Sequence, residues 1–248
     1  MNTYAPLNQV INNGGQKNLL GKSPSKQARF IFEDLKDYMA KGLLPVNSKL
    51  NLQVLKKKYA VSTGVVHAAI ANLLDSRFAY KGRTGVFVAG LSLEELREIL
   101  NLRFTLEKEA IKTAIAYGHD EWESHIVSVC HRLVRLEEKI VLQNLDGDIE
   151  WLKAWSSLYQ DFHLALSSCA KLDVSVIFIG ILYSQCEKYF LHSLLGHDLS
   201  LKNFSGHHEA LKNAVLVRDV KLTEKLLSEH LEKIYQVVKG CIDTRYLN

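Results

Sequence analysis

The chain lacks the features that mark secreted, disulfide-linked or membrane-spanning proteins. Its four cysteines, Cys130, Cys169, Cys186 and Cys241, show no Cys-x-x-Cys spacing, so reduced thiols in the cytoplasm are expected. No apolar run reaches about 18 residues, and no basic region followed by an apolar core opens the chain, so neither a membrane span nor a secretory signal is expected. Proline is scarce as well: all three prolines precede residue 46, which favours a mostly helical remainder.

Acidic residues are scarce in the first third of the chain. Residues 1–90 hold 13 Lys and Arg against 4 Asp and Glu, a net charge of +9, whereas residues 91–248 hold 18 against 23, a net charge of −5. The opposite signs predict two domains with different partners. A basic domain of this size is typical of a surface for polyanions, most simply nucleic acid; the alternative is a solvated basic face without a partner.

Three short helices are predicted near the N-terminus. Residues 1–23 are rich in Asn, Gly and Gln without helical periodicity, and we expect a flexible tail. Ser25 then caps a helix with apolar residues at a spacing of four, and Gly42 ends it. Asn51 caps the short helix "LQVLKKKY", and Ser62 caps a helix that runs to about residue 75. Two short helices joined by a tight turn predict a helix-turn-helix.

The periodicity changes after this helix. In "RFAYKGRTGVFVAG", apolar residues alternate on both sides of a Gly-Arg-Thr-Gly centre, which is typical of a β-hairpin. Lys81 and Arg83 give the hairpin a basic tip. Residues 24–90 are therefore predicted to form a winged helix-turn-helix domain.

A different pattern begins at Ser92, where Ser92 and Glu95 form a capping box. Long helical segments without proline then run to the C-terminus, and no repeat period is evident. We expect residues 91–248 to form an antiparallel all-helical bundle, so the predicted fold class is mainly α. The expected helices are 93–117, 120–143, 147–169, 173–195, 205–217 and 220–240.

Several motifs in one order resemble the GntR family of bacterial transcription regulators, in the FadR subfamily with an FCD effector domain. The winged-helix part follows the family pattern from "KGLLPVNSKLNLQVLKKKYAVSTGVVHAAI" to "LEELREI". In the bundle, "LNLRFTLEKEAI", "FHLAL", "HEALKNAV" and "DVKLTEKLLSEHL" match successive elements. The resemblance implies a homodimer that binds double-stranded DNA and responds to a small organic acid, and it implies no enzymatic activity.

The predicted recognition helix departs from the family, which places arginines where this chain has Thr63 and His67 and a proline where it has Val65. The helix geometry is retained without the bidentate arginine contacts to guanine. We expect base contacts from the leading turn and phosphate contacts from neighbouring cations; the alternative is a paralogue that has lost specific DNA binding and serves as a sensory or interaction module. The candidate DNA-binding residues are Lys56, Lys57, Lys58, Ser62, Thr63, Gly64, His67, Lys81 and Arg83.

Three histidines fall in the register that the resemblance assigns to metal ligands: His163, His208 and His230. Three imidazoles bind Zn²⁺ or a similar ion, and the alternative is that they are hydrogen-bonded core residues. The family's metal-binding members also use an aspartate one turn before the first histidine, where this chain has Tyr159. Asp161 lies two residues along, on the opposite face of a helix, and does not substitute for it.

Arg103 stands at the family's "LR…LE" position, where it is expected to pair with an effector carboxylate. The alternative is a salt bridge with Glu107, one helical turn later. Tyr159 is a second candidate for contact with the effector. A metal-dependent enzyme that activates water is an alternative function, but no carboxylate stands at a clear general-base spacing from the histidines, and the basic winged domain would have no role.

Overall fold

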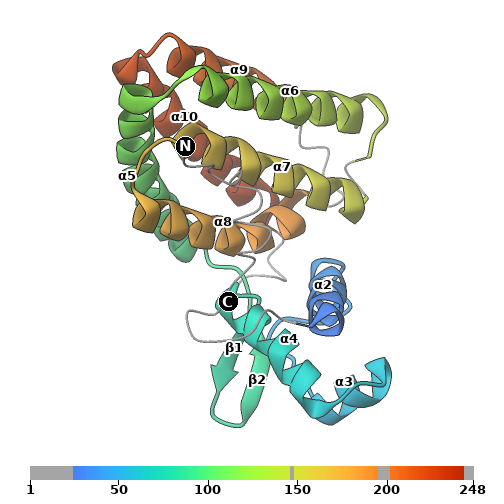
Figure 1. Ribbon diagram of the computed structural model, residues 1–248. Helices are drawn as coiled ribbons and strands as arrows, with labels where there is room; N and C mark the ends of the chain where they lie inside the picture. The colour runs from blue at the N-terminus through green and yellow to red at the C-terminus, as the bar shows by residue number, and fades with distance from the viewer. Residues whose placement is uncertain (1–24, 146–147, 195–201, 243–248) are drawn as a thin grey trace.

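The computed structural model describes residues 25–145, 148–194 and 202–242, so the predicted tail at 1–23 lies outside the described residues. The architecture is mainly helical with one small antiparallel sheet, as predicted (Figure 1). The elements are α2 (Lys26–Ala40), α3 (Leu52–Tyr59), α4 (Thr63–Asp75), β1 (Ala79–Gly82), β2 (Gly85–Val88), α5 (Leu93–Tyr117), α6 (Asp120–Leu142), α7 (Ile149–Ser167), α8 (Asp173–Leu194), α9 (Lys202–Leu216) and α10 (Val220–Cys241).

The first three helices form a helix-turn-helix core. The Ser25 hydroxyl accepts a hydrogen bond from the backbone N–H of Ala28, and Asn51 Oδ1 caps α3 through two backbone N–H groups. Ser62 precedes α4 as predicted, but its side chain makes no capping hydrogen bond, so that expectation was wrong. Buried apolar residues of α4 pack on α2: Val66, Ala69, Ile70 and Leu73.

The hairpin follows α4 in the predicted place. β1 pairs with β2 in an antiparallel register that sets Ala79 against Val88 and Gly82 against Gly85. Gly85 has a φ of +149°, where an L side chain is strained and a Cβ would meet the Lys49 side chain. Glycine is therefore required at the turn that carries the basic tip.

The remaining helices form the bundle, and their bounds agree with the predicted segments to within three residues at each end. α5 packs against α8 and α10, while α6 packs against α7 and α9 (Figure 1). The Trp122 indole N–H donates to the Ala165 carbonyl at 2.9 Å, which joins α6 to α7. Because α7, α9 and α10 all bury one face in the interior, polar residues on those faces are brought together there.

Ion pairs join the winged-helix elements to the bundle. Lys36 of α2, buried, lies 2.7 Å from Glu187 of α8, and Lys153 of α7 lies 2.9 Å from Asp37 of α2. Glu95, in the first turn of α5, accepts hydrogen bonds from Lys188 and from the Tyr189 hydroxyl, both at 2.6 Å. α8 is therefore the bundle helix that meets both α2 and the start of α5.

α8 corrects one expectation, because the sequence was expected to hold no segment apolar enough for a membrane span. Asp173–Ser193 meets the length and composition of such a span, with a mean hydropathy of 1.2 and 39% of the window buried. A core helix of a soluble protein meets the same criteria. The buried side of α8 packs in the bundle, and its N-terminal half exposes Val174, Ile177, Phe178 and Ile181.

The turn between α3 and α4 generates a stability prediction. Ala60 is exposed and adopts the left-handed conformation with a φ of 51°, which costs a non-glycine residue about 1–2 kcal/mol. Ala60→Gly removes this cost. Glycine also makes the unfolded chain more flexible, which lowers the free energy of unfolding by about 0.4–1 kcal/mol and offsets part of the gain. We expect the free energy of unfolding in urea to rise by up to about 1 kcal/mol.

The matched control makes the same chemical change inside α4. Ala71→Gly should lower the free energy of unfolding by about 1 kcal/mol, because helix interiors disfavour glycine. Equal destabilisation by both changes would contradict the strained turn.

Candidate metal and effector site and candidate DNA-binding surface

Three histidines from three helices meet in the bundle interior. One ring nitrogen from each of His163 (α7), His208 (α9) and His230 (α10) lies within 4.8 Å of the others, and all three side chains are fully buried. His163 Nε2 and His230 Nε2 are 3.2 Å apart. Two nitrogens on one tetrahedral zinc are about 3.3 Å apart, given Zn–N bonds of about 2.0–2.1 Å. The spacing therefore fits a shared metal ion.

The helical patterns explain why the histidines meet. Each histidine continues a buried stripe at three- or four-residue spacing, so the side of the helix that packs is also the side that carries the ligand. The stripes comprise Trp155, Tyr159, Phe162 and Leu166 on α7, Phe204, Leu211 and Val215 on α9, and Leu227, Leu231 and Ile234 on α10.

Arg103 is fully buried beside this cluster and makes a salt bridge with Glu107. Its Nε donates to Glu107 Oε1 at 2.7 Å, its Nη2 donates to the Tyr159 hydroxyl at 3.2 Å, and it also contacts the Tyr183 hydroxyl. The salt bridge with Glu107, the alternative for Arg103, is thus present, and pairing with an effector carboxylate stays a prediction. The other oxygen of Glu107 lies 3.0 Å from His163 Nδ1.

Burial and the Arg103 charge set the protonation of the site. Burial raises the pKa of Glu107, but Arg103 and His163 outweigh it and lower that pKa to about 2. Burial lowers the pKa of His163 to about 4 and the pKa of His230 well below its ordinary value. Burial also raises the pKa of Tyr159. At neutral pH the site therefore holds an anionic carboxylate, a neutral phenol, and neutral imidazoles at His163 and His230.

Several buried polar atoms of the site have no hydrogen-bond partner among the described residues. They are both ring nitrogens of His208, Nδ1 of His230 and Oε2 of Glu137. Buried polar groups are rarely left unpaired, and imidazole nitrogens are good ligands for Zn²⁺ and similar ions. The donor set therefore fits a metal ion held by His163, His208 and His230.

Tyr159 and Asp161, the two oxygen-bearing residues close to His163 in α7, have different surroundings. The Tyr159 hydroxyl lies 3.1 Å from His230 Nε2, so it belongs to the site. Burial raises the pKa of the Asp161 carboxyl, which lies near Arg132 and His125. Asp161 is not among the clustered ligands, as its helical position predicted.

The predicted DNA-contacting residues of α4 lie on an open surface. Ser62, Thr63, Gly64 and His67 are exposed, whereas the following stripe of α4 is buried. The first backbone N–H groups of α4 point out of the same end, and helix N-termini favour phosphate.

The predicted cations divide into two groups. Lys56, Lys57, Lys81 and Arg83 are exposed. Lys58 is also partly exposed, but its ammonium lies 3.7 Å from the Tyr38 ring centroid and 3.4 Å from Asp34. Lys58 is therefore held within the protein more firmly than its two neighbours.

Sequence reasoning missed some residues of the buried site. Glu107 was named only as a salt-bridge partner, although the spacing of four from Arg103 signals it. Tyr183 and Glu137 reach the site from α8 and α6, and no sequence signal links them to it. Trp151 and Trp155 stand one turn apart on α7, which predicts core residues; Trp155 is buried, and its indole N–H also donates to Glu137 at 3.0 Å.

Three further histidines, His192, His197 and His207, lie near the polar stretch "GHDLSLKNFSG", whose composition predicts a surface position for them. His192 is half-buried and its Nδ1 lies 2.7 Å from the Lys188 carbonyl, so this expectation was wrong. His207 is also half-buried, and its Nε2 lies 3.3 Å from the Lys233 ammonium. His197 lies outside the described residues.

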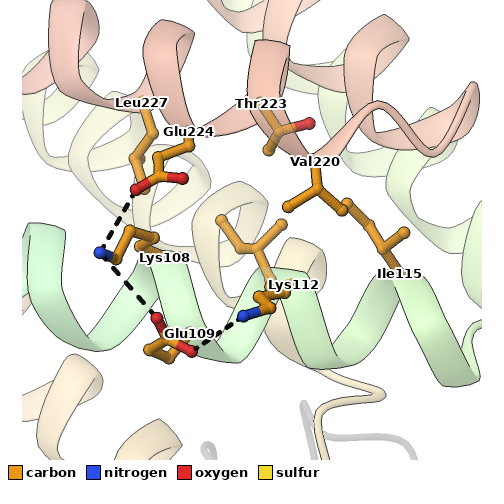
Figure 2. Close-up of a pocket in the computed structure, with 9 residues that line it drawn as sticks. Lys108, Glu109, Lys112, Ile115, Val220, Thr223, Glu224 and Leu227 are labelled. Atoms are coloured by element: carbon orange, nitrogen blue, oxygen red, sulfur yellow. Dashed lines mark ion pairs between the residues drawn. The ribbon is translucent and has the colours of Figure 1, made fainter.

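A surface pocket of about 210 Å³ between α5 and α10 is distinct from the buried site. Figure 2 shows Lys108 between Glu224 and Glu109, at 3.3 and 3.9 Å, and Lys112 directed toward Glu109. The cations of this pocket are thus already paired, and it does not contain the predicted effector residues.

A winged helix-turn-helix joined to a helical bundle is the architecture of a class of transcription regulators. The FCD domain model matches residues 98–233. The chain is 30% identical over 246 residues to the uncharacterized HTH-type transcriptional regulator BphR of Paraburkholderia xenovorans, covering 96% of this chain and 98% of that protein. It is 28% identical over 201 residues to the HTH-type transcriptional repressor GlaR of Escherichia coli, covering 79% and 89%.

Solved structures agree in fold. E. coli McbR/YncC superposes with a TM-score of 0.65 at 19% identity, covering 87% of this chain and 98% of that one. A putative GntR regulator from Rhodococcus superposes with a TM-score of 0.63 at 16% identity, covering 88% and 100%. The chain belongs to the GntR family of transcriptional regulators and carries an FCD domain. Membership of this family confirms the prediction that the protein is a transcription regulator and not an enzyme.

The buried ion pair generates a second prediction. Arg103→Met leaves Glu107 charged and without its main partner in the interior, and such losses cost about 3–5 kcal/mol. We expect this drop in the free energy of unfolding, measured by urea denaturation.

The control removes a surface arginine from the same helix. Arg97 pairs with Glu232 while partly exposed, so Arg97→Met should cost about 0–1 kcal/mol. Similar losses for both variants would show that burial of the pair is not what matters.

Proposed function

We propose that this protein is a ligand-responsive transcription regulator of the FadR subfamily, acting in the cytoplasm as a homodimer on operator DNA. Residues 24–90 bind DNA, and residues 91–248 bind the effector and dimerise. The observation that carries this proposal is the contrast between an exposed surface and a buried cluster in one chain. The leading turn of α4 is exposed and lies in a part of the chain that also exposes the cations of α3 and the wing tip, whereas the histidine and arginine cluster of the bundle is fully buried.

The DNA contacts follow from which groups are accessible. Lys56, Lys57, Lys81 and Arg83 contact phosphates, which positions the protein without reading sequence. Thr63 and His67 reach base edges from the exposed turn of α4, and Gly64 lets the backbone approach closely. The Ser62 hydroxyl is free for a phosphate because it makes no capping bond.

The effector is a small organic acid that binds beside the histidines. Arg103 is the natural partner for its carboxylate, and the neighbouring Tyr159 hydroxyl is a hydrogen-bonding group for the same ligand. Because Glu107 already pairs with Arg103, the effector competes with an internal carboxylate. A bound metal ion held by His163, His208 and His230 would supply Lewis-acid binding to a ligand oxygen.

The signal passes from the site to the DNA-binding part through α8. Tyr183 and Cys186 contact Arg103, and Glu187 and Lys188 directly follow Cys186. Glu187 pairs with Lys36 of α2, and Lys188 pairs with Glu95 at the start of α5. Displacement of α8 by an effector therefore acts on the winged-helix elements and on the connection at Ser92 together.

The homodimer is supported by the exposed face of α8. Val174, Ile177, Phe178 and Ile181 lie at helical spacing, and each is between 39% and 67% exposed. No charged residue interrupts α8 between Asp173 and Glu187. An uninterrupted apolar face on a regulator that must read a two-fold DNA site fits a second copy of the chain.

A paralogue without specific DNA binding is the second candidate. The observation that favours it is the absence of arginine from α4, since Thr63 and His67 offer single hydrogen bonds in place of bidentate contacts. The two candidates differ in one measurement, the ratio of specific to non-specific affinity on genomic fragments. A ratio near one at every salt concentration would support the paralogue.

Removal of a phosphate contact should weaken binding and lower its salt dependence. We expect Lys57→Ala and Arg83→Ala each to reduce the slope of log K against log salt by about one, because each contact releases counterions. Fluorescence anisotropy with a fragment selected from the genome measures the slope.

Lys225→Ala is the control for this titration. Lys225 is an exposed lysine of α10, paired with Glu229 and outside the winged-helix elements. Its removal should leave the slope unchanged. An unchanged slope in the Lys57 and Arg83 variants would count against the proposed DNA surface.

A charge on the α8 face should disrupt the dimer. Ile177→Asp places a carboxylate in the proposed apolar interface, and we expect the dimer dissociation constant to rise at least about tenfold, as for 1.4 kcal/mol or more. Analytical ultracentrifugation measures it. Leu142→Asp, on an exposed leucine of α6, is the control and should leave the dimer intact. A monomeric unaltered protein would refute the homodimer.

A further inference from the structure

Two of the three histidines each have a buried carboxylate next to them: Glu107 beside His163 and Glu137 beside His208. We propose that Glu137 is a positioning residue of the metal site, which orients His208 and supplies negative charge to it, as Glu107 does for His163. This inference rests on the proposed metal site. It adds a residue from α6, a helix that contributes none of the three histidines.

The Glu107 arm shows how such a residue works. Glu107 Oε2 lies 3.0 Å from His163 Nδ1, and the carboxylate is anionic, so Nδ1 carries the proton and donates it. His163 Nε2 then keeps its lone pair, and this nitrogen lies 3.2 Å from His230 Nε2 in the histidine cluster. A carboxylate that fixes the tautomer and ring direction of a ligating histidine is a common outer partner in metal sites.

Glu137 has the corresponding place behind His208. Its Oε1 lies 3.0 Å from His208 Nδ1 and accepts a hydrogen bond from the Trp155 indole at 3.0 Å. The Trp155 indole N–H therefore holds the Glu137 carboxylate in place independently of His208. His208 Nδ1 is close to Glu137 without the alignment of a hydrogen bond.

The charge of Glu137 is otherwise poorly compensated. It is 1% exposed, and among the described residues its ion-pair partner is His208, not a lysine or arginine. Its Oε2 has no hydrogen-bond partner among those residues. A buried carboxylate in such surroundings is costly unless a cation lies close by. A divalent ion on the far side of His208 offsets that cost.

This arrangement explains how the site accommodates Tyr159. The family's metal-binding pattern has an aspartate there, and Tyr159 is neutral and contacts Arg103 and His230. Glu107 and Glu137 contact the imidazoles and not the ion, so the negative charge would lie further from the ion than the aspartate of the family's pattern. The histidines are the direct ligands, and the carboxylates polarise them.

The test measures metal affinity in the full chain purified without a histidine tag. Zn²⁺ and Co²⁺ are titrated against a chromophoric chelator for the unaltered protein, Glu137→Gln and Glu137→Ala. We expect the affinity to fall about tenfold for Gln, which keeps an acceptor for the indole, and up to about 100-fold for Ala. The visible spectrum of bound Co²⁺, which reports its coordination, should change in Glu137→Ala and be partly restored in Glu137→Gln.

Glu138→Gln is the matched control, because Glu138 is the next residue of α6, partly exposed and paired with Arg135. It should leave the affinity and the Co²⁺ spectrum unchanged. The proposal is overturned if Glu137→Gln and Glu137→Ala bind Zn²⁺ as tightly as the unaltered protein. It is also overturned if the affinity falls only in proportion to a loss of metal-free thermal stability, which indicates a purely structural role.

Failure of the unaltered protein to bind either ion overturns the inference together with the proposed metal site. DNA binding, measured on the same samples, then distinguishes failure of the metal site from failure of the proposed regulator function. Retained binding with a normal salt slope leaves the regulator function standing without the metal.

Discussion

The fully buried pair of Arg103 and Glu107 is the interaction on which the bundle interior depends. A guanidinium and a carboxylate in the interior are tolerated only when paired and hydrogen-bonded, because removing either charge from water is costly. Tyr159, Tyr183 and His163 satisfy the remaining donors and acceptors, so residues of α5, α7 and α8 meet around one charge pair. The same pair keeps Glu107 ionised, and an ionised Glu107 fixes the tautomer of His163.

The replacement of an aspartate by Tyr159 changes what the site can bind. An aspartate would bring a negative charge into direct contact with the ion, whereas the phenol is neutral and serves as a hydrogen-bonding group between Arg103 and His230. In the proposed metal site, the electrostatic attraction for a cation would come from Glu107 and Glu137 through the imidazoles. In the proposed function, the position without a protein carboxylate is the one open to an acidic ligand.

α8 connects the chemistry of the bundle with the DNA-binding part because its faces have different partners. Tyr183 and Cys186 meet Arg103, the next turn carries Glu187 and Lys188, and the N-terminal half exposes an apolar face. A shift of this helix therefore changes contacts at the site and at α2 together. The apolar composition of α8, which meets the criteria for a membrane span, combines a buried face in the bundle with an exposed apolar face in its N-terminal half.

Sequence alone determined the helices and the hairpin, because local spacing, capping residues and turn glycines act over a few residues, whereas the grouping of the three histidines was implied by the family resemblance. It also marked Arg103 and Glu107 as a pair, since residues four apart share a helix face. Only the tertiary structure brought Glu137 and Tyr183 to the histidines, and only it showed that Lys58 is held by Asp34 and Tyr38. These contacts join residues far apart in the chain, and their distances depend on how whole helices pack, which no local pattern records.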